Sequence, residues 1–133
     1  MNGYLLDTNI CVFLLRQKYS VADRLLNAGI KNCSISEITV AELLYGAYCS
    51  NNLQQNIKAV NIFCERFNVL SITESLSLYA KERARLRRSG ITVEPFDLII
   101  GCTAVTNNLI MVTENTKHFI NINGIELENW IER

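Results

Sequence analysis

The sequence lacks any apolar run that approaches the roughly 20 consecutive residues a helix needs to cross a bilayer. Its N-terminus lacks the basic start and small-residue cleavage site of a signal peptide. No Cys-x-x-Cys pair occurs, which argues against a zinc knuckle and against a dithiol redox motif. We therefore expect a protein without membrane contact that stays in the cytoplasm.

The few cysteines carry no pattern either. They are odd in number and widely spaced, and each lies among apolar neighbours: Cys11, Cys33, Cys49, Cys64 and Cys102. Such residues usually behave as small hydrophobic side chains, so we expect all five to be buried.

The length of the chain sets its organisation. Its 133 residues correspond to one domain, residues 1–133, and 49% of them are hydrophobic, as in ordinary globular proteins. A chain of this size buries roughly two thirds of its unfolded surface, which is enough for a core of its own. No repeat, linker or low-complexity tract divides it.

Net charge is zero, which taken alone argues against a nucleic-acid partner. The charge is unevenly distributed, however. Residues 81–88 hold five basic residues and one acid, and the rest of the chain holds eight bases and twelve acids. A basic patch on an acidic remainder suits a protein that binds metal in one place and phosphates in another.

Hydrophobic periodicity predicts alternating strands and helices. Strands are expected at residues 4–6, 33–36, 69–72 and 109–113, with an edge strand at 125–127. Helices are expected at residues 8–16, 21–28, from 39 onward, around 57–67, at 73–89 and at 95–107, with a helical turn at 116–119. This alternation predicts an α/β fold, in which helices cover a parallel sheet.

Three carboxylates lie where such a sheet would place a site. Asp7 ends the first strand, Glu42 lies one turn into the helix after the second strand, and Asp97 begins the helix after Pro95. Each is set among apolar residues, where a charge is costly unless something compensates it. A magnesium ion prefers oxygen ligands and would compensate all three, and it would also orient a phosphate for attack by water.

A structural interpretation of the same residues remains open. Asp7 and Asp97 are suitable helix N-caps. Thr39 and Glu42 have the spacing of a capping box, in which a threonine caps a helix and a glutamate three residues later bonds back to it. Capping and metal binding are compatible with each other.

Four blocks resemble the motifs of PIN-domain ribonucleases, above all the VapC toxins of bacterial toxin–antitoxin pairs. They occur in the expected order and read LLDTNIC (5–11), SEITVAELLYGA (36–47), PFDLIIG (95–101) and VTENTKHF (112–119). LENW (127–130) is similar to the usual ending of the family. The resemblance spans nearly the whole chain.

The resemblance implies a PIN-like three-layer α/β/α fold with a central parallel sheet of four to five strands. It also implies hydrolysis of RNA with Mg²⁺ or Mn²⁺. Asp7 and Asp97 would be direct metal ligands, Glu42 a ligand directly or through water, and Thr8 and Thr113 hydrogen-bond partners of acids or waters.

The resemblance further implies partners. A VapB-type antitoxin would neutralise the enzyme, DNA would be reached only through that antitoxin, and the toxin would form a homodimer. Transfer RNA, including the anticodon loop of the initiator, is the first guess for the substrate.

The chain departs from the family at the fourth acidic position. Many members carry Asp where this chain has Asn115, whose neutral carbonyl attracts a second cation less. We expect one metal to be held firmly, and a second weakly or only with substrate phosphate.

The basic segment offers a candidate RNA contact. Lys81, Arg85 and Arg88 are spaced to share one helix face, and Arg85 is the leading candidate for phosphate. The alternative is a solvated charged face. The only histidine, His118, is expected at the surface. The aromatic helix faces of Tyr45, Tyr48, Phe63 and Phe67 suit either the core or a groove for the antitoxin.

Two other functions compete. A phosphatase that uses Asp at the end of the first strand would usually carry a second Asp two residues on, where this chain has Asn9. A non-catalytic binding module would use the three acids only as helix caps.

Overall fold

The computed structural model describes residues 3–133 of the chain. The strands of this part are β1 (Tyr4–Leu6), β2 (Cys33–Ser36), β3 (Asn68–Leu70), β4 (Ile110–Val112) and β5 (Glu126–Glu128). The helices are α1 (Thr8–Leu15), α2 (Val21–Ala28), α3 (Glu37–Tyr48), α4 (Leu53–Glu65), α5 (Leu76–Arg88), α6 (Pro95–Thr106) and α7 (Thr116–Phe119). Single 3-10 turns lie at Ile30–Asn32 and Thr73–Ser75. Across residues 3–133, no helix is both long enough and apolar enough to span a bilayer.

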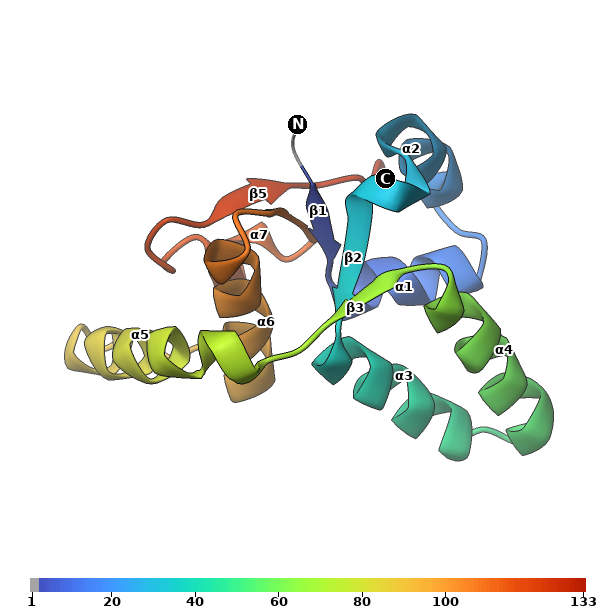
Figure 1. Cartoon of the computed structure of the whole chain (residues 1–133), viewed down its shortest axis with the longest axis horizontal. Coiled ribbons are helices and arrows are strands. Elements are labelled where there is room, and N and C mark those ends of the chain that lie inside the picture. Colours follow the sequence, from blue (N-terminus) through green and yellow to red (C-terminus); the bar gives the residue numbers. More distant parts are fainter. Residues whose placement is uncertain (1–2) are drawn as a thin grey trace.

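All five strands run parallel in one sheet of order β3-β2-β1-β4-β5 (Figure 1). The predicted parallel sheet is confirmed, with its edge strand beside β4. Because β1 lies at the centre, the carboxyl ends of β1, β2 and β4 meet at one edge, where open α/β sheets bind their ligands. Asp7 follows β1 directly, and Thr113 follows β4.

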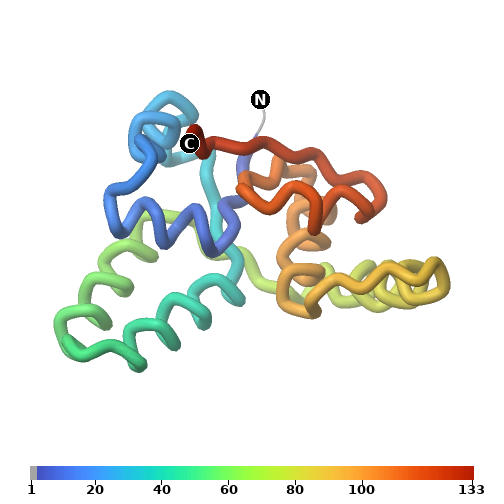
Figure 2. The backbone as a smooth tube through the Cα atoms, turned by 180° about the vertical axis from the view of Figure 1, so that it is seen from behind, coloured from blue at the N-terminus to red at the C-terminus, as the bar shows by residue number. Residues whose placement is uncertain are grey.

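Alternate strand residues face two separate cores, as the two-residue period of a strand requires. Leu6 and Val112 pack with side chains of α1 to α4, whereas Leu5 and Met111 pack with side chains of α5 to α7. The sheet is therefore covered on both faces, which confirms the three-layer α/β/α arrangement. Figures 1 and 2 show the α3–α4 hairpin and the α5–α6 pair diverging on either side of the sheet.

Two of the caps considered from the sequence, Thr39 and Asp97, are wrong. Helix α3 begins at Glu37, with Ser36 as its N-cap accepting from the Ile38 N–H at 3.0 Å, so Thr39 is no cap. Strand β2 leads into the helix without a turn, which places the cap at the last strand residue. The N-cap of α6 is Glu94, whose side chain accepts from the Asp97 N–H at 3.1 Å. Of the three proposed caps, only Asp7 caps its helix.

The basic face predicted for α5 is only partly exposed, because Arg85 is engaged with a buried glutamate. Glu82 is only 2% exposed, and Arg85 donates to both of its carboxylate oxygens, at 2.8 and 2.9 Å. The Asn123 N–H also donates to Glu82, and Arg85 donates to the Asn121 carbonyl at 2.6 Å. The Arg85 pairing lowers the pKa of Glu82 despite burial. Arg85 thus ties α5 to the segment after α7.

The cysteine prediction is confirmed in part. Cys11, Cys33 and Cys102 are buried, Cys64 is half-buried, and Cys49 is exposed. Cys49 escapes burial because it is the C-cap of α3, at the tip of the α3–α4 hairpin.

The Glu82–Arg85 pair yields a stability prediction. Arg85→Gln should lower the free energy of unfolding by about 1–3 kcal/mol, because it leaves a buried carboxylate without its counter-ion. Arg88→Gln removes an exposed charge from the same helix and should stay within about 0.5 kcal/mol of wild type. Urea denaturation at neutral pH measures both, and equal effects of the two changes would contradict the structural role of Arg85.

Candidate active site

Asp7 is held rigidly at the end of β1. It is 4% exposed, and its Oδ1 accepts from the Thr8 N–H at 2.8 Å as the N-cap of α1. Its Oδ2 accepts from the hydroxyl of Thr113, also at 2.8 Å, across the junction of β1 and β4. Burial raises the pKa of Asp7 more than these two hydrogen bonds lower it, and the charge of Glu42 raises it further.

Glu42 reaches the same edge from α3. The Thr8 hydroxyl donates to its Oε1 at 2.7 Å and lies 2.9 Å from the hydroxyl of the buried Thr39. Thr8 therefore serves two acids at once, with its N–H on Asp7 and its hydroxyl on Glu42. Thr39, which resembled a helix cap in the sequence, belongs to this hydrogen-bond chain.

Asp97 approaches from the first turn of α6. Burial raises its pKa to about 6, and the negative charges of Asp7, Glu94 and Glu42 contribute in that order. Within residues 3–133, we find no side chain that donates a hydrogen bond to the Asp97 carboxylate. The strongest charges acting on it are therefore negative, and none of the described side chains forms an ion pair with it.

Asn115 lies on the loop after β4. Its N–H donates to the Thr113 hydroxyl at 3.0 Å, so the hydroxyl that holds Asp7 also anchors this loop. The side chain of Asn115 is exposed. The neighbouring Glu114 is paired with Arg133 and points away to the C-terminus, so it does not replace the missing fourth acid.

The three predicted acids converge electrostatically, but they are not closed around an ion. In the part of the chain that the structure covers, no three His, Cys, Asp or Glu side chains form a ready-made metal cage. The donor set nevertheless fits magnesium, which takes few carboxylates and keeps several waters.

Sequence reasoning missed two contributors to this site. Glu94 directly precedes the predicted helix at 95–107, and its carboxylate caps α6 and acts on Asp97; its position three residues before Asp97 was the available signal. His118 is exposed on α7 as predicted, but its charge lowers the pKa of Asp7 and of Asp97, as the last cause in each case. No pattern in the sequence connected His118 with these acids.

The PIN domain family matches residues 4–125 of the chain. The chain belongs to the PIN-domain family. This PIN domain is 39% identical over 133 residues to the tRNA(fMet)-specific endonuclease VapC of Shigella flexneri, with 98% of this chain and 99% of that protein covered. It is 34% identical over 130 residues to Ribonuclease VapC1 of Haemophilus influenzae (strain R2866), with 96% and 97% covered.

Solved structures give the same result. The crystal structure of DNA-bound VapBC from Salmonella typhimurium matches with a TM-score of 0.90 and 35% identity, over 98% of this chain and 99% of that chain. VapBC2 from Rickettsia felis, bound to a DNA fragment from its promoter, matches with a TM-score of 0.87 and 34% identity, over 96% and 98%. The resemblance of this PIN domain to VapC-type toxins is thereby confirmed, and so is its enzyme class, since the named relatives are ribonucleases.

The raised pKa of Asp97 yields a pH prediction for the protein in EDTA. A folded-state pKa of about 6, above the usual 3.8, means that ionisation of Asp97 lowers stability as pH rises from about 4 to about 6. Asp97→Asn avoids this cost and should be more stable than wild type at pH 7.5 by about 1–2 kcal/mol. The whole pKa shift, expressed as free energy at about 1.4 kcal/mol per pKa unit, would give a larger value. We expect less because Asp97 is only half-buried and solvent screens part of the charge.

The advantage of Asp97→Asn should shrink toward zero at pH 4.5, where wild-type Asp97 is protonated. Glu126→Gln neutralises an exposed carboxylate in β5 and serves as the matched control. Thermal denaturation at both pH values measures the difference. A stability gap that does not depend on pH would contradict the electrostatic origin.

Proposed function

We propose that this chain is the ribonuclease toxin of a toxin–antitoxin pair, and that it cleaves RNA with Mg²⁺ held by Asp7, Glu42 and Asp97. The observation that carries the proposal is the electrostatic coupling of three acids from three separate elements. Each follows or faces the carboxyl edge of the sheet, and the charges of Asp7 and Glu42 add to the burial that raises the pKa of Asp97 to about 6. Acids kept charged against such a cost are typical of a cation site.

The chain's own residues have distinct tasks in this mechanism. Thr113 and the Thr8 N–H fix both oxygens of Asp7, and the Thr8 hydroxyl fixes Glu42. Asp97 stays free of hydrogen-bond donors from the described side chains, so both its oxygens are available. Asn115 presents a neutral amide beside the cluster. When bound, the cation would supply charge to orient the phosphate and to favour ionisation of water.

The proposed reaction is hydrolysis of the RNA backbone. Water attacks the phosphorus in line, the bond to the 3′ oxygen breaks, and 5′-phosphate and 3′-hydroxyl ends remain. The carboxylates accept the proton that water loses, and solvent protonates the leaving oxygen.

The substrate and partner follow from the relatives. Because a similar protein is named for initiator tRNA, we propose tRNA as the substrate of this chain. Because similar chains were solved as VapBC complexes, some with DNA, we propose a VapB-type antitoxin as the partner that neutralises the enzyme and contacts DNA. A homodimer remains part of this proposal.

Cleavage of bulk tRNA tests the proposal directly. The purified protein should cleave in Mg²⁺ or Mn²⁺ and stop in EDTA, and Asp97→Asn should lower the rate by at least about a hundredfold. Asp7→Asn should also abolish cleavage while the fold is kept, because asparagine still caps α1. Sequencing of the cleavage ends identifies the RNA and the termini.

Metal titration separates the enzyme from a non-catalytic module. Mn²⁺ should raise the melting temperature of the wild type but not that of Asp97→Asn. A folded wild type that is neither stabilised by metal nor active on RNA would instead support the module in which the acids only cap helices.

Thr8 yields a second activity prediction. Thr8→Val keeps the N–H on Asp7 but removes the hydroxyl from Glu42, so kcat should fall by about 10–100-fold. The metal concentration for half-maximal activity should rise, because Glu42 is no longer oriented. Thr8→Ser restores the hydroxyl and should retain most activity. A Thr8→Val enzyme with wild-type kcat and wild-type metal requirement would remove Thr8 from the mechanism.

A further inference from the structure

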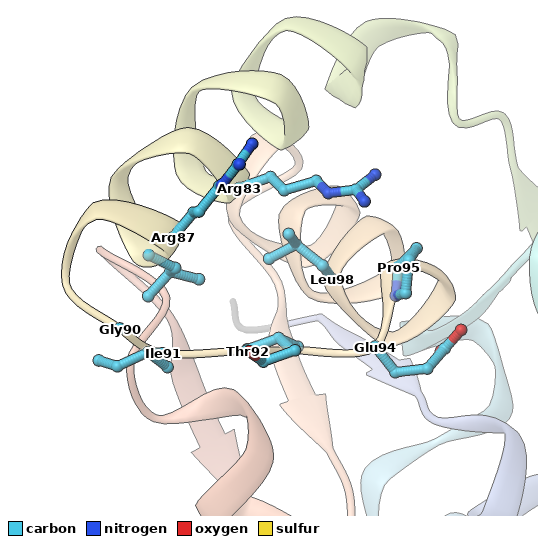
Figure 3. A pocket seen from close by; sticks show the side chains of 10 residues that line it. Arg83, Arg87, Gly90, Ile91, Thr92, Glu94, Pro95 and Leu98 are labelled. Atoms are coloured by element: carbon cyan, nitrogen blue, oxygen red, sulfur yellow. The ribbon is translucent and has the colours of Figure 1, made fainter.

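A pocket of about 690 Å³ lies between the C-terminal half of α5, the loop through residues 90–94 and the first turn of α6 (Figure 3). Its volume is within the roughly 300–1,000 Å³ of small-molecule sites. Ile91, Val93 and Pro95 contribute the accessible apolar surface of its lining, and Leu86 and Leu98, each 1% exposed, lie behind that surface in the core. Gly90, with φ of +75°, turns the chain back so that the Ile91 N–H donates to the Leu86 carbonyl at 2.9 Å, which fixes this wall.

Two arginines line the side formed by α5. Arg83 and Arg87 are one helical turn apart and share a face of α5, and both are exposed. The Arg83 guanidinium donates to the Tyr79 hydroxyl at 2.7 Å, an orienting contact that leaves its other N–H groups available. For Arg87 we find no acidic partner within residues 3–133. Both guanidinium groups are thus available for an anion, unlike that of Arg85.

The pocket adjoins the candidate active site through Glu94. Glu94 lines the pocket, and the same carboxylate accepts from the N–H of Asp97. One wall of the pocket carries the two arginines, and the wall across from it carries Glu94, three residues before Asp97. Figure 3 shows Arg83 and Arg87 on α5 and Glu94 and Pro95 across the pocket from it.

We infer that this pocket binds a nucleotide of the RNA substrate adjacent to the cleaved phosphate, with that nucleotide's phosphate on Arg83 and Arg87 and its base on the apolar surface. The inference rests on the proposed ribonuclease function and adds a substrate subsite to it. Arginine guanidinium groups bind phosphate and stack on unpaired bases. Apolar side chains suit a base that has left its stack, so the pocket selects single-stranded or looped RNA over a paired strand.

The test compares two double variants. Arg83→Gln with Arg87→Gln should raise KM for tRNA by about 10-fold or more with kcat little changed, because binding is lost while the acids are untouched. Lys31→Gln with Lys58→Gln removes the same charge from exposed positions elsewhere and should match wild type. Thr92→Trp, which fills the pocket without changing charge, should weaken binding as the arginine changes do.

Binding is measured separately from cleavage in the Asp97→Asn background. Fluorescence anisotropy with a short labelled single-stranded RNA should show that the two arginine changes together reduce the log–log slope of Kd against salt by about 0.7, the value for the one phosphate that both arginines contact on a single strand. If the wild type cleaves no RNA, the proposed function fails. If the wild type cleaves RNA and the arginine variant behaves like its control, only the pocket fails.

Two further outcomes would overturn the subsite. Lys81→Gln with Arg88→Gln removes two charges from the same helix outside the pocket, and an equal loss of RNA binding would mean that α5 attracts RNA by charge alone. Loss of affinity for the antitoxin protein, with RNA binding intact in the arginine variant, would mean that the pocket serves the partner rather than the substrate.

Discussion

The constraint on which this structure depends is that one buried and two half-buried carboxylates meet at one edge of a parallel sheet, with no arginine or lysine of residues 3–133 paired with them. The chain brings Asp7, Glu42 and Asp97 there from β1, α3 and α6, and burial raises the pKa of both Asp7 and Asp97. Only neutral donors support them: the Thr8 N–H and the hydroxyls of Thr8 and Thr113. Neutral donors orient a carboxylate but leave its charge in place, which is the condition for binding a hard cation.

Glu82 is a buried carboxylate with a structural role, and it can be compared with the acids at the sheet edge. Glu82 is as buried as Asp7, yet Arg85 contacts both its oxygens and lowers its pKa, whereas the pKa of Asp97 is raised to about 6. An arginine therefore neutralises the buried acid on α5, whereas within residues 3–133 no arginine is paired with the acids at the sheet edge. Pairing Asp97 with an arginine would make the fold more stable in the absence of metal and would leave no charge for a cation.

The fold could be predicted well from the sequence because hydrophobic periodicity and the apolar neighbours of an acid can both be seen within a short stretch of chain. Strand and helix periods located the layers, and apolar residues around Asp7, Glu42 and Asp97 marked them as costly charges. The failures were in contacts between distant segments. Thr39 had the spacing of a cap, but β2 runs directly into α3 and makes Ser36 the cap. Whether Arg85 faces solvent depends on where residues 121–123 lie, and hydrophobic periodicity does not predict that position.

The basic segment shows how one helix serves two purposes. Glu82 and Arg85 turn toward the segment after α7, whereas Arg83 and Arg87, four residues apart, turn toward the loop that leads into α6. A count of charges along residues 81–88 treats all five basic residues alike, but only their angular position on α5 separates those that hold the fold from those that remain available to an anion. Because Glu94 links that loop to Asp97, a change in the loop would alter the pocket and the carboxylate cluster together. The position of α6 thus sets both the place of Asp97 and the shape of the pocket in which, by our proposal, a substrate nucleotide lies.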